Sequence, residues 1–260
     1  MHEKELVMRI TFLGTGCGFP TADRYCASIL LDVSGRLYLI DAGAPVVDIF
    51  ARTGRRVEDI KGVFLSHFHL DHVAGAIQLV DLAMNYYRES RFDVYTPSVH
   101  EVQAIKTLIA ASGASCESDR IGLKNYLTPW KDTLDFDDGY LRLTAIKTRH
   151  CENNPASPIK SYAFYVEAEG KRLLFTNDVS MHFSSDDFPR IAYEGHFDLV
   201  VSECGHINAD ELMEKMRGVD TAAFAVTHVN VEVNMQRLKE IQNGYKGKMH
   251  LPSDGDTVEI

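Results

Sequence analysis

Apolar residues along this chain gather in short runs, and most runs end at a polar or charged residue. Short apolar or alternating runs that are bounded by turn-forming residues are typical of strands. In the first part of the chain they predict strands near residues 8–14, 28–33, 36–41, 62–66 and 92–95. In the second part they predict strands near residues 140–147, 172–177 and 222–227.

Stretches with helical spacing of apolar residues alternate with these strands. They predict helices near residues 45–52, 73–88, 99–111, 210–216 and 234–241. The polar stretch at residues 112–132 is predicted to lack a regular element and separates two series of strands and helices. Consecutive strands followed by strand–helix alternation favour two mixed sheets with helices on their outer faces. The pattern therefore predicts an α/β protein, and because no Pro/Gly/Ser linker divides it we expect one domain over residues 1–260.

The composition is that of a globular chain. Of 260 residues, 45% are hydrophobic and 25% are charged, which is enough to bury a sizeable core. No apolar run approaches the roughly 18 residues that a membrane span needs, and residues 1–5 lack the basic start and apolar core of a signal peptide. We therefore expect a cytoplasmic protein with no membrane partner. The five cysteines form no Cys-x-x-Cys pair and leave an odd one, so no disulfide framework is indicated, and Cys151 and Cys204 are interpreted as packing residues.

The densest group of reactive side chains follows the predicted strand at residues 62–66. His67, His69, Asp71 and His72 lie close together in the chain, although only 11 of its 260 residues are histidines. Imidazole nitrogens and carboxylate oxygens suit zinc, manganese or iron, and this spacing lets one strand-to-helix turn present ligands to two neighbouring ions. A polar loop that is merely rich in histidine is the alternative, and the density of the cluster argues against it.

Further residues of the metal-binding type stand at the ends of other predicted strands. They are Asp41, His150, Asp178 and His228. Taken alone, an Asp at a strand end is more often a helix cap, and a lone His is more often an ordinary surface or core residue. Their joint occurrence at strand ends, where α/β proteins place their sites, is what indicates a metal centre.

The order Asp, His-x-His-x-Asp-His, His, Asp, His resembles the metallo-β-lactamase superfamily, and the match runs from Ile10 to the closing residues 254–260. The resemblance implies a four-layer αββα sandwich with two divalent metal ions at one edge of the paired sheets, Zn2+ first and Mn2+ or Fe as alternatives. The ligands that it implies are His67, His69 and His150 for one ion and Asp71, His72 and His228 for the other. It further implies that Asp178 bridges the ions and that Asp41 orients the ligand turn. Members that reduce oxygen or nitric oxide have Glu in place of His69, so a hydrolase is favoured.

The residues after the first predicted strand narrow the resemblance. Residues 14–24, Gly-Thr-Gly-Cys-Gly-Phe-Pro-Thr-Ala-Asp-Arg, followed by Ser28, resemble the opening of the ribonuclease Z (tRNase Z) branch, which cleaves RNA phosphodiesters. A simple tight turn is the alternative interpretation of these glycines. In that branch a Glu and a His after the bridging Asp relay a proton to the leaving group, and Glu203 and His206 occupy comparable places. Polar caps of a helical turn are the alternative for this pair.

The chain departs from that branch in ways that bear on the substrate. His150 and Asp178 are only 28 positions apart, which leaves no room for the Gly/Pro-rich arm that grips tRNA in that family. The His-Glu-Ala-Thr signature is replaced by Ser-Glu-Cys-Gly at residues 202–205, and Tyr25 stands where Asn is usual. With 27 Lys+Arg against 37 Asp+Glu the net charge is −10, the wrong sign for extended contacts to phosphates.

We therefore expect a dinuclear metal-dependent hydrolase, specifically a phosphodiesterase of small or nucleotide-like substrates that acts through a metal-bridging hydroxide. Asp71 and Asp178 are expected to hold and orient that hydroxide, and Glu203 and His206 are expected to protonate the departing oxygen. The alternatives are tRNA 3′ processing, hydrolysis of a lactone, thioester or other carboxylic substrate, and a non-catalytic metal-binding regulatory module. RNA is a less favoured partner than a small phosphodiester, and a homodimer is left open.

Overall fold

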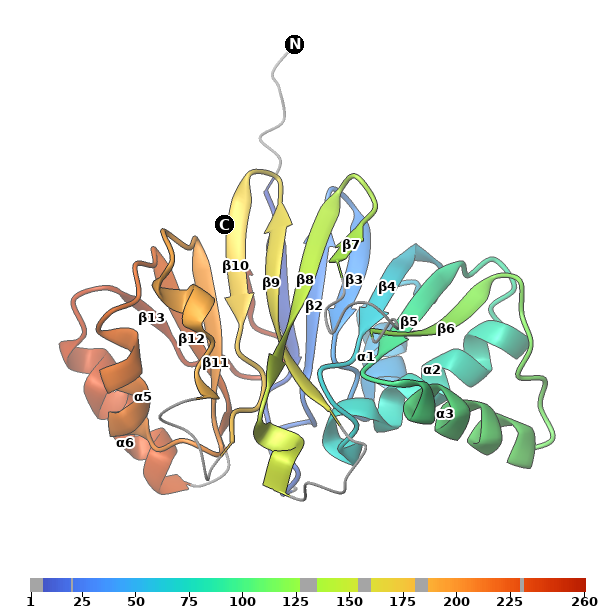
Figure 1. The fold of residues 1–260 in the computed structure, drawn as a ribbon, viewed down its shortest axis with the longest axis horizontal. Helices are drawn as coiled ribbons and strands as arrows, with labels where there is room; N and C mark the ends of the chain where they lie inside the picture. Colours follow the sequence, from blue (N-terminus) through green and yellow to red (C-terminus); the bar gives the residue numbers. More distant parts are fainter. Residues whose placement is uncertain (1–6, 20, 127–134, 154–159, 181–186, 230–231) are drawn as a thin grey trace, which may run out of the picture.

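The computed structural model describes residues 7–19, 21–126, 135–153, 160–180, 187–229 and 232–260. Within them, two seven-stranded sheets face each other and helices cover their outer faces (Figure 1). The strand order is β14-β1-β2-β3-β4-β5-β6 in the first sheet and β13-β12-β11-β10-β9-β8-β7 in the second. The four-layer αββα sandwich that the sequence predicts is therefore confirmed.

The first sheet comes from the N-terminal part of the chain and from one strand near its end. Its strands are β1 (Arg9–Gly14), β2 (Ser28–Val33), β3 (Arg36–Ile40), β4 (Ile60–Phe64), β5 (Phe92–Thr96), β6 (Ile121–Asn125) and β14 (Thr257–Glu259). From β3 to β6 the strands are parallel, because a helix returns the chain between each pair. These helices are α1 (Val46–Thr53), α2 (Leu70–Asn85) and α3 (Val99–Ala111), and a 3-10 turn, η1 (Val57–Asp59), precedes β4.

The second sheet repeats this plan with the later part of the chain. Its strands are β7 (Asp135–Asp137), β8 (Leu141–Thr148), β9 (Ser161–Ala168), β10 (Lys171–Phe175), β11 (Leu199–Cys204), β12 (Ala223–Val229) and β13 (Lys248–His250). From β7 to β10 they are antiparallel, and from β10 to β13 they are parallel. Its helices are α5 (Ala209–Met216) and α6 (Glu232–Gly244), with 3-10 turns at η2 (His150–Asn153) and η3 (Arg190–Tyr193).

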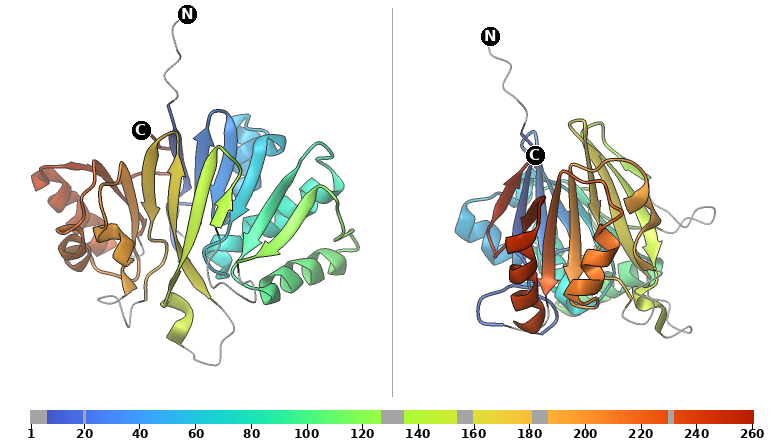
Figure 2. Two further views of the ribbon diagram at one scale, coloured as in Figure 1. Left: turned by 45° about the horizontal axis from the view of Figure 1, so that its top comes forward. Right: turned by 90° about the vertical axis from the view of Figure 1, so that its left-hand side faces the viewer.

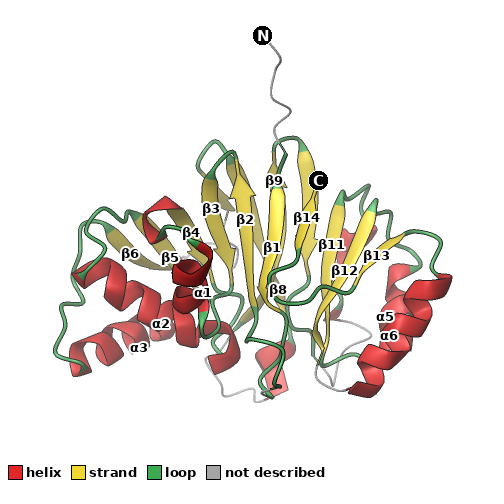
Figure 3. Cartoon of the chain, turned by 180° about the vertical axis from the view of Figure 1, so that it is seen from behind, coloured by secondary structure: helices red, strands yellow, loops and turns green. Residues whose placement is uncertain are grey.

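Three hydrophobic cores hold the layers together. The central core lies between the sheets and includes Phe12, Phe64 and Phe164, each with 0% exposure. Burial of one such side chain contributes about 1.5–3 kcal/mol to folding. A second core packs α1, α2 and α3 on the first sheet, and a third packs α5 and α6 on the second. Seen from behind in Figure 3, the helices accordingly flank the strands on both sides.

The candidate site residues lie where strands of the two sheets end. The backbone N–H of Tyr162 donates to the carbonyl of Ser66 over 3.0 Å, which ties the start of β9 to the turn after β4. The loops after β4, β8, β10 and β11 meet at this edge. In the left view of Figure 2, α5 and α6 lie on one side of the strands and α2 and α3 on the other. Side chains that are far apart in the sequence therefore come together at one edge of the sandwich.

Several elements differ from the sequence prediction, which names no strand at the positions of β7, β9, β11, β13 and β14. Helix α2 begins at Leu70 instead of residue 73, because polar residues fill its first turn and the extended His69 (φ −70°, ψ 146°) is its N-cap. The polar stretch at residues 112–132 was predicted to lack a regular element, and this is wrong because β6 lies within it and pairs with β5 at the edge of the sheet. Among the described residues, no helix combines the length and the apolar character that crossing a lipid bilayer requires.

Candidate metal centre and active site

The turn between β4 and α2 presents the first group of site residues. His67 lies three residues after the end of β4, whereas Asp71 and His72 lie in the first turn of α2. This turn fits tightly against the loop after β3, since a Cβ atom on Gly43 would lie 2.2 Å from the carbonyl oxygen of Asp71. Only glycine permits that approach, so the local sequence fixes where the helix starts.

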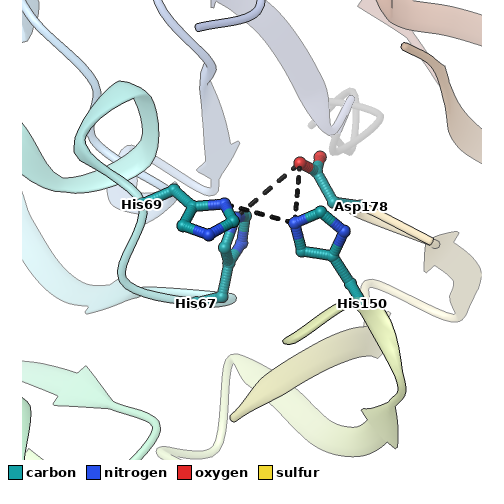
Figure 4. A group of neighbouring side chains, drawn as sticks. All are labelled: His67, His69, His150 and Asp178. Atoms are coloured by element: carbon teal, nitrogen blue, oxygen red, sulfur yellow. Dashed lines mark hydrogen bonds and ion pairs between the residues drawn. The ribbon is translucent and has the colours of Figure 1, made fainter. Parts of the chain in front are cut away.

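One group of four side chains points toward a common centre (Figure 4). They are His67, His69, His150 and Asp178. The Nδ1 atom of His69 lies 2.9 Å from Nε2 of His67 and 3.2 Å from Nε2 of His150. The Oδ2 atom of Asp178 lies 3.7 Å from each of these Nε2 atoms. Ligands of one tetrahedral zinc ion lie about 3.4 Å from one another, as bonds of roughly 2.1 Å require, so the four side chains fit a single ion.

A second group of donors lies beside the first. The Nε2 atoms of His72 and His228 are 3.2 Å apart, and Oδ2 of Asp71 lies 3.4 Å and 3.2 Å from them. The same Asp178 oxygen that faces the first group lies 3.4 Å from Nε2 of His72. The structure thus brings together all seven residues that the resemblance implies as ligands. Their roles in metal binding stay predictions.

The environment holds His67, His150 and Asp178 in the protonation form that metal ligation requires, whereas His72 has to release a proton when a cation binds. Burial lowers the pKa of His67 well below its ordinary value and that of His150 to about 4, so both rings are neutral. Burial opposes the charge of Asp178, but the neighbouring His228 and His72 hold its carboxyl pKa well below its usual range. Burial likewise opposes a charge on His72, yet Asp178 and Asp41 raise its pKa well above the ordinary value. Neutral imidazoles and ionised carboxylates are the forms that bind divalent cations, so the donor set fits the implied metals.

Asp41 supports two of the histidines through hydrogen bonds on the side that faces away from the metal centre, directly for His72 and through Ser66 for His67. Its Oδ1 accepts the backbone N–H of Ser66 over 2.7 Å, and its Oδ2 accepts the Ser66 hydroxyl over 2.8 Å and lies 2.7 Å from Nδ1 of His72. The Ser66 hydroxyl oxygen lies 3.0 Å from Nδ1 of His67. The contacts to His72 and His67 occupy Nδ1, the ring nitrogen that faces away from the centre. Nε2 of each ring is then left to bind a metal ion. The geometry is the one expected for a residue that orients the ligand turn.

Glu203 and His206 stand on the other side of the centre. Glu203 is the second-last residue of β11, is 1% exposed, and accepts the backbone N–H groups of Val179 (3.2 Å), His206 (2.8 Å) and Gly205. Nδ1 of His206 lies 3.4 Å from Oε1 of Glu203 and 3.6 Å from Oδ2 of Asp178. Burial opposes a charge on this ring, but the nearby carboxylates of Glu203 and Asp178 raise its pKa to about 9. The pair therefore places a protonated ring beside the two donor groups.

A pocket of about 170 Å³ opens onto these side chains. It is lined by Cys17, Gly18, Phe19, His69, Asp71, Asp178, Gly205, His206 and His228. None of these lining residues is Lys or Arg, so among the described residues the pocket wall offers no basic side chain to a polyanion. Pro20 of the N-terminal motif and residues 154–159 of the loop after His150 lie outside the described residues.

Sequence reasoning missed the anchor of the loop that carries Phe19. The carboxylate of Asp254 accepts the backbone N–H (2.8 Å) and the hydroxyl (2.7 Å) of Thr15 and also the backbone N–H of Tyr25. The carbonyl of Thr15 in turn accepts the backbone N–H of His228 over 2.9 Å. The only signal was the closing segment at residues 254–260, which indicated a resemblance but not a contact with this loop.

Comparison with known proteins gives three results. Residues 8–213 match the family model described as Anti-Pycsar protein Apyc1. A ribonuclease Z from Methanopyrus kandleri is 36% identical over 103 residues, which cover 40% of this chain and 36% of that protein. The chain thus spans about a third of the length of the curated relatives that it matches.

Solved structures are similar over nearly the whole chain. The metallo-β-lactamase fold protein YhfI from Bacillus subtilis has a TM-score of 0.74 at 20% identity, with 98% of this chain and 100% of that chain covered. A diphosphatase from the PhnP family has a TM-score of 0.71 at 15% identity, with 98% of both chains covered. The metallo-β-lactamase fold and the resemblance to ribonuclease Z that the motifs indicated are confirmed.

Proposed function

The chain belongs to the family of the anti-Pycsar protein Apyc1, and we propose that it is a dinuclear metal-dependent hydrolase that cleaves phosphodiesters of small or nucleotide-like molecules. The observation that carries the proposal is the position of the Asp178 carboxylate. Its Oδ2 atom lies 3.4 Å from Nε2 of His72 in one donor group and 3.7 Å from Nε2 of His67 in the other. One carboxylate between two groups of imidazoles is what a two-metal hydrolase requires.

The donors divide into two sets that share this carboxylate. His67, His69 and His150 would hold one cation, and Asp71, His72 and His228 would hold the other. Two cations bound there would lower the pKa of a water molecule so that hydroxide forms near neutral pH, and would stabilise charge on the phosphoryl oxygens. The chain itself holds this constellation in place through Asp41, whose hydrogen bonds fix the rings on the β4–α2 turn.

Protonation of the leaving group falls to His206 and Glu203. The His206 side chain is 24% exposed and lines the pocket, so it can reach a bound substrate. Glu203 is fixed by three backbone N–H groups and lies 3.4 Å from Nδ1 of His206, so it orients the ring and stabilises its proton. A general acid needs this combination of reach and support.

The pocket favours a small substrate over a long RNA. Proteins that track a nucleic-acid backbone present Lys and Arg along it, whereas none lines the described pocket and the net charge is −10. The second candidate is cleavage of RNA, which is favoured by the identity of 36% over 103 residues to a ribonuclease Z. Hydrolysis of a thioester at the same centre would expel a thiolate, which needs less protonation by His206 than the alkoxide that leaves an alkyl phosphodiester.

A substrate panel tests the proposal. Purified protein loaded with zinc or manganese is given bis-p-nitrophenyl phosphate, a lactone and a precursor tRNA, and initial rates are compared before and after chelation. We expect the phosphodiester to be hydrolysed fastest and the activity to disappear with the metal. Asp178→Asn should abolish it, whereas Asp220→Asn, a change at a surface residue with a 72% exposed side chain, should not. Turnover of only lactones or thioesters would refute the proposal, and efficient tRNA processing would favour the second candidate.

A further inference from the structure

The rim of the active-site pocket carries an aromatic ring that the proposed chemistry does not use. Phe19 lines the pocket together with His206 and Asp71, yet it is 73% exposed. Single exposed apolar residues are common on protein surfaces and need no explanation by themselves. Phe19 differs from those because it stands at the mouth of a site whose other described walls are imidazoles, carboxylates, glycines and one cysteine.

The loop that carries Phe19 is held firmly against the site. Gly18 lies directly over Asp71, because a Cβ atom there would be 3.4 Å from the carboxylate carbon. Asp254 ties both ends of the loop through Thr15 and Tyr25. These contacts hold Thr15, Gly18 and Tyr25 near the site, which places Phe19 at the mouth of the pocket.

The pocket volume shows which part of a ligand the ring would meet. At about 170 Å³ the pocket is smaller than the roughly 300–1,000 Å³ of sites that enclose a drug-sized ligand. A pocket of this volume suits a phosphate group beside His206 better than a whole nucleotide. The remainder of such a molecule must lie at the rim, where the exposed surface of Phe19 is the large apolar surface among the described lining residues.

We propose that Phe19 stacks against the base of a nucleotide-type substrate while the phosphate occupies the pocket, so that this ring selects substrates with an aromatic group beside the phosphodiester. The inference rests on the proposed function and adds the substrate class to it. Every base presents a π face, so stacking favours bases in general and does not choose among them. The absence of Lys and Arg from the described lining agrees with recognition by stacking instead of charge.

Binding of two matched phosphates to the metal-loaded protein tests the proposal. Adenosine 5′-monophosphate and ribose 5-phosphate share the sugar phosphate, lack a phosphodiester bond and differ in the base. Isothermal titration calorimetry gives a Kd for each, and their ratio isolates the base. Stacking of a base on an aromatic side chain is worth about 1–3 kcal/mol, so Phe19→Ala should reduce the preference for the adenosine compound by about 5- to 150-fold.

Three further variants separate stacking from other effects. Phe19→Tyr should keep the preference, whereas Phe19→Leu should lose most of it because Leu is apolar but has no π face. Tyr86→Ala is the matched control, since this aromatic residue is 72% exposed and ends the 16-residue helix α2, about 24 Å along the helix from the site. It should change neither Kd.

The outcomes distinguish this inference from the function on which it rests. Equal weakening of both compounds by Phe19→Ala, or full preference in Phe19→Leu, would overturn stacking even if bis-p-nitrophenyl phosphate is hydrolysed normally. Loss of the preference in Phe19→Ala with unchanged ribose 5-phosphate binding would support it. Failure of the wild-type protein to hydrolyse any phosphodiester would refute the proposed function separately, because the binding ratio is measured without turnover.

Discussion

Asp41 offers a test of how the ligand turn is held, because one carboxylate controls two rings. Asp41→Asn is nearly isosteric and suits the backbone, since Asn tolerates the positive φ of 55° found at this position. Three donors face the two oxygens of Asp41, from the Ser66 amide, the Ser66 hydroxyl and Nδ1 of His72. The carboxamide keeps only one acceptor oxygen, so its NH2 group must face a former donor.

The expected consequence is a change of tautomer. An NH2 group beside Nδ1 of His72 favours the ring whose proton is on Nε2, and that nitrogen then cannot bind a cation. Loss of such a hydrogen-bond partner typically weakens metal binding 10- to 100-fold, which is about 1.4–2.8 kcal/mol. We expect this loss at the site that includes His72 and a smaller one at the site that includes His67, which Asp41 reaches only through Ser66.

The assay is a competition titration of zinc against a chelator, which resolves the two dissociation constants. Ser66→Ala is the matched variant, because it breaks the link to His67 and leaves the contact of 2.7 Å between Asp41 and His72. It should weaken mainly the site that includes His67. If Asp41→Asn leaves both constants within about twofold of the wild-type values, the idea that Asp41 sets the tautomers is wrong.

The remaining predictions concern the metals, the acid and the fold. Elemental analysis should find two transition-metal ions per chain; Asp178→Ala should weaken both sites and His228→Ala mainly one, and equal effects of the two variants would remove Asp178 as a bridge. His206→Ala should lower turnover by roughly 10² to 10⁴ without changing metal content, and the loss should grow with the pKa of the leaving group, whereas a flat ratio would make His206 a structural residue. The carboxylate of Asp138 accepts a hydrogen bond from the Tyr38 hydroxyl over 2.6 Å. Burial opposes the charge of Asp138, but this hydrogen bond and those from backbone N–H groups lower the pKa of its carboxyl. Because the carboxyl pKa is lower in the folded than in the unfolded state, the stabilisation is present above about pH 4 and is lost as the pH falls further. Asp138→Ala should therefore lower the free energy of unfolding, measured with urea, by about 2 kcal/mol at pH 7 and by less at pH 3.

The sequence predicted many of the elements whose hydrophobic pattern is strong, although it did not name β9 and β11, which are almost wholly buried. Residues 99–111 were predicted as a helix, and α3 has these same bounds because its apolar residues recur with helical spacing and Ser98 caps it. The start of α2 was placed three residues late, since the apolar period begins at Val73 while the first turn is polar. Strand β6 was missed because an edge strand buries few side chains, here only Ile121 fully, and so carries a weak pattern.

The site was predictable to the extent that its residues stand at strand ends. The motif from His67 to His72 and the later candidates could be read from spacing, and the structure brings them within a few ångströms of one another. The hydrogen bond that anchors the loop before Ser28 could not be predicted from the sequence, because it joins Thr15 and Asp254, which are 239 positions apart. No local preference encodes such a contact, which depends on the register of β14 beside β1.

The anchoring of this loop by Asp254 sets an order of events during synthesis on the ribosome. At about 5–20 residues per second, the 239 positions between Thr15 and Asp254 take roughly 12–48 seconds to translate. For most of that interval the nascent chain already contains His67 and His72, but the loop that carries Phe19 lacks its anchor, and until residue 228 is made the chain also lacks His228. The pocket can therefore mature only after Asp254 has emerged, so a chain that stalls before His150 is made would carry four of the seven predicted donors and no formed site for substrate.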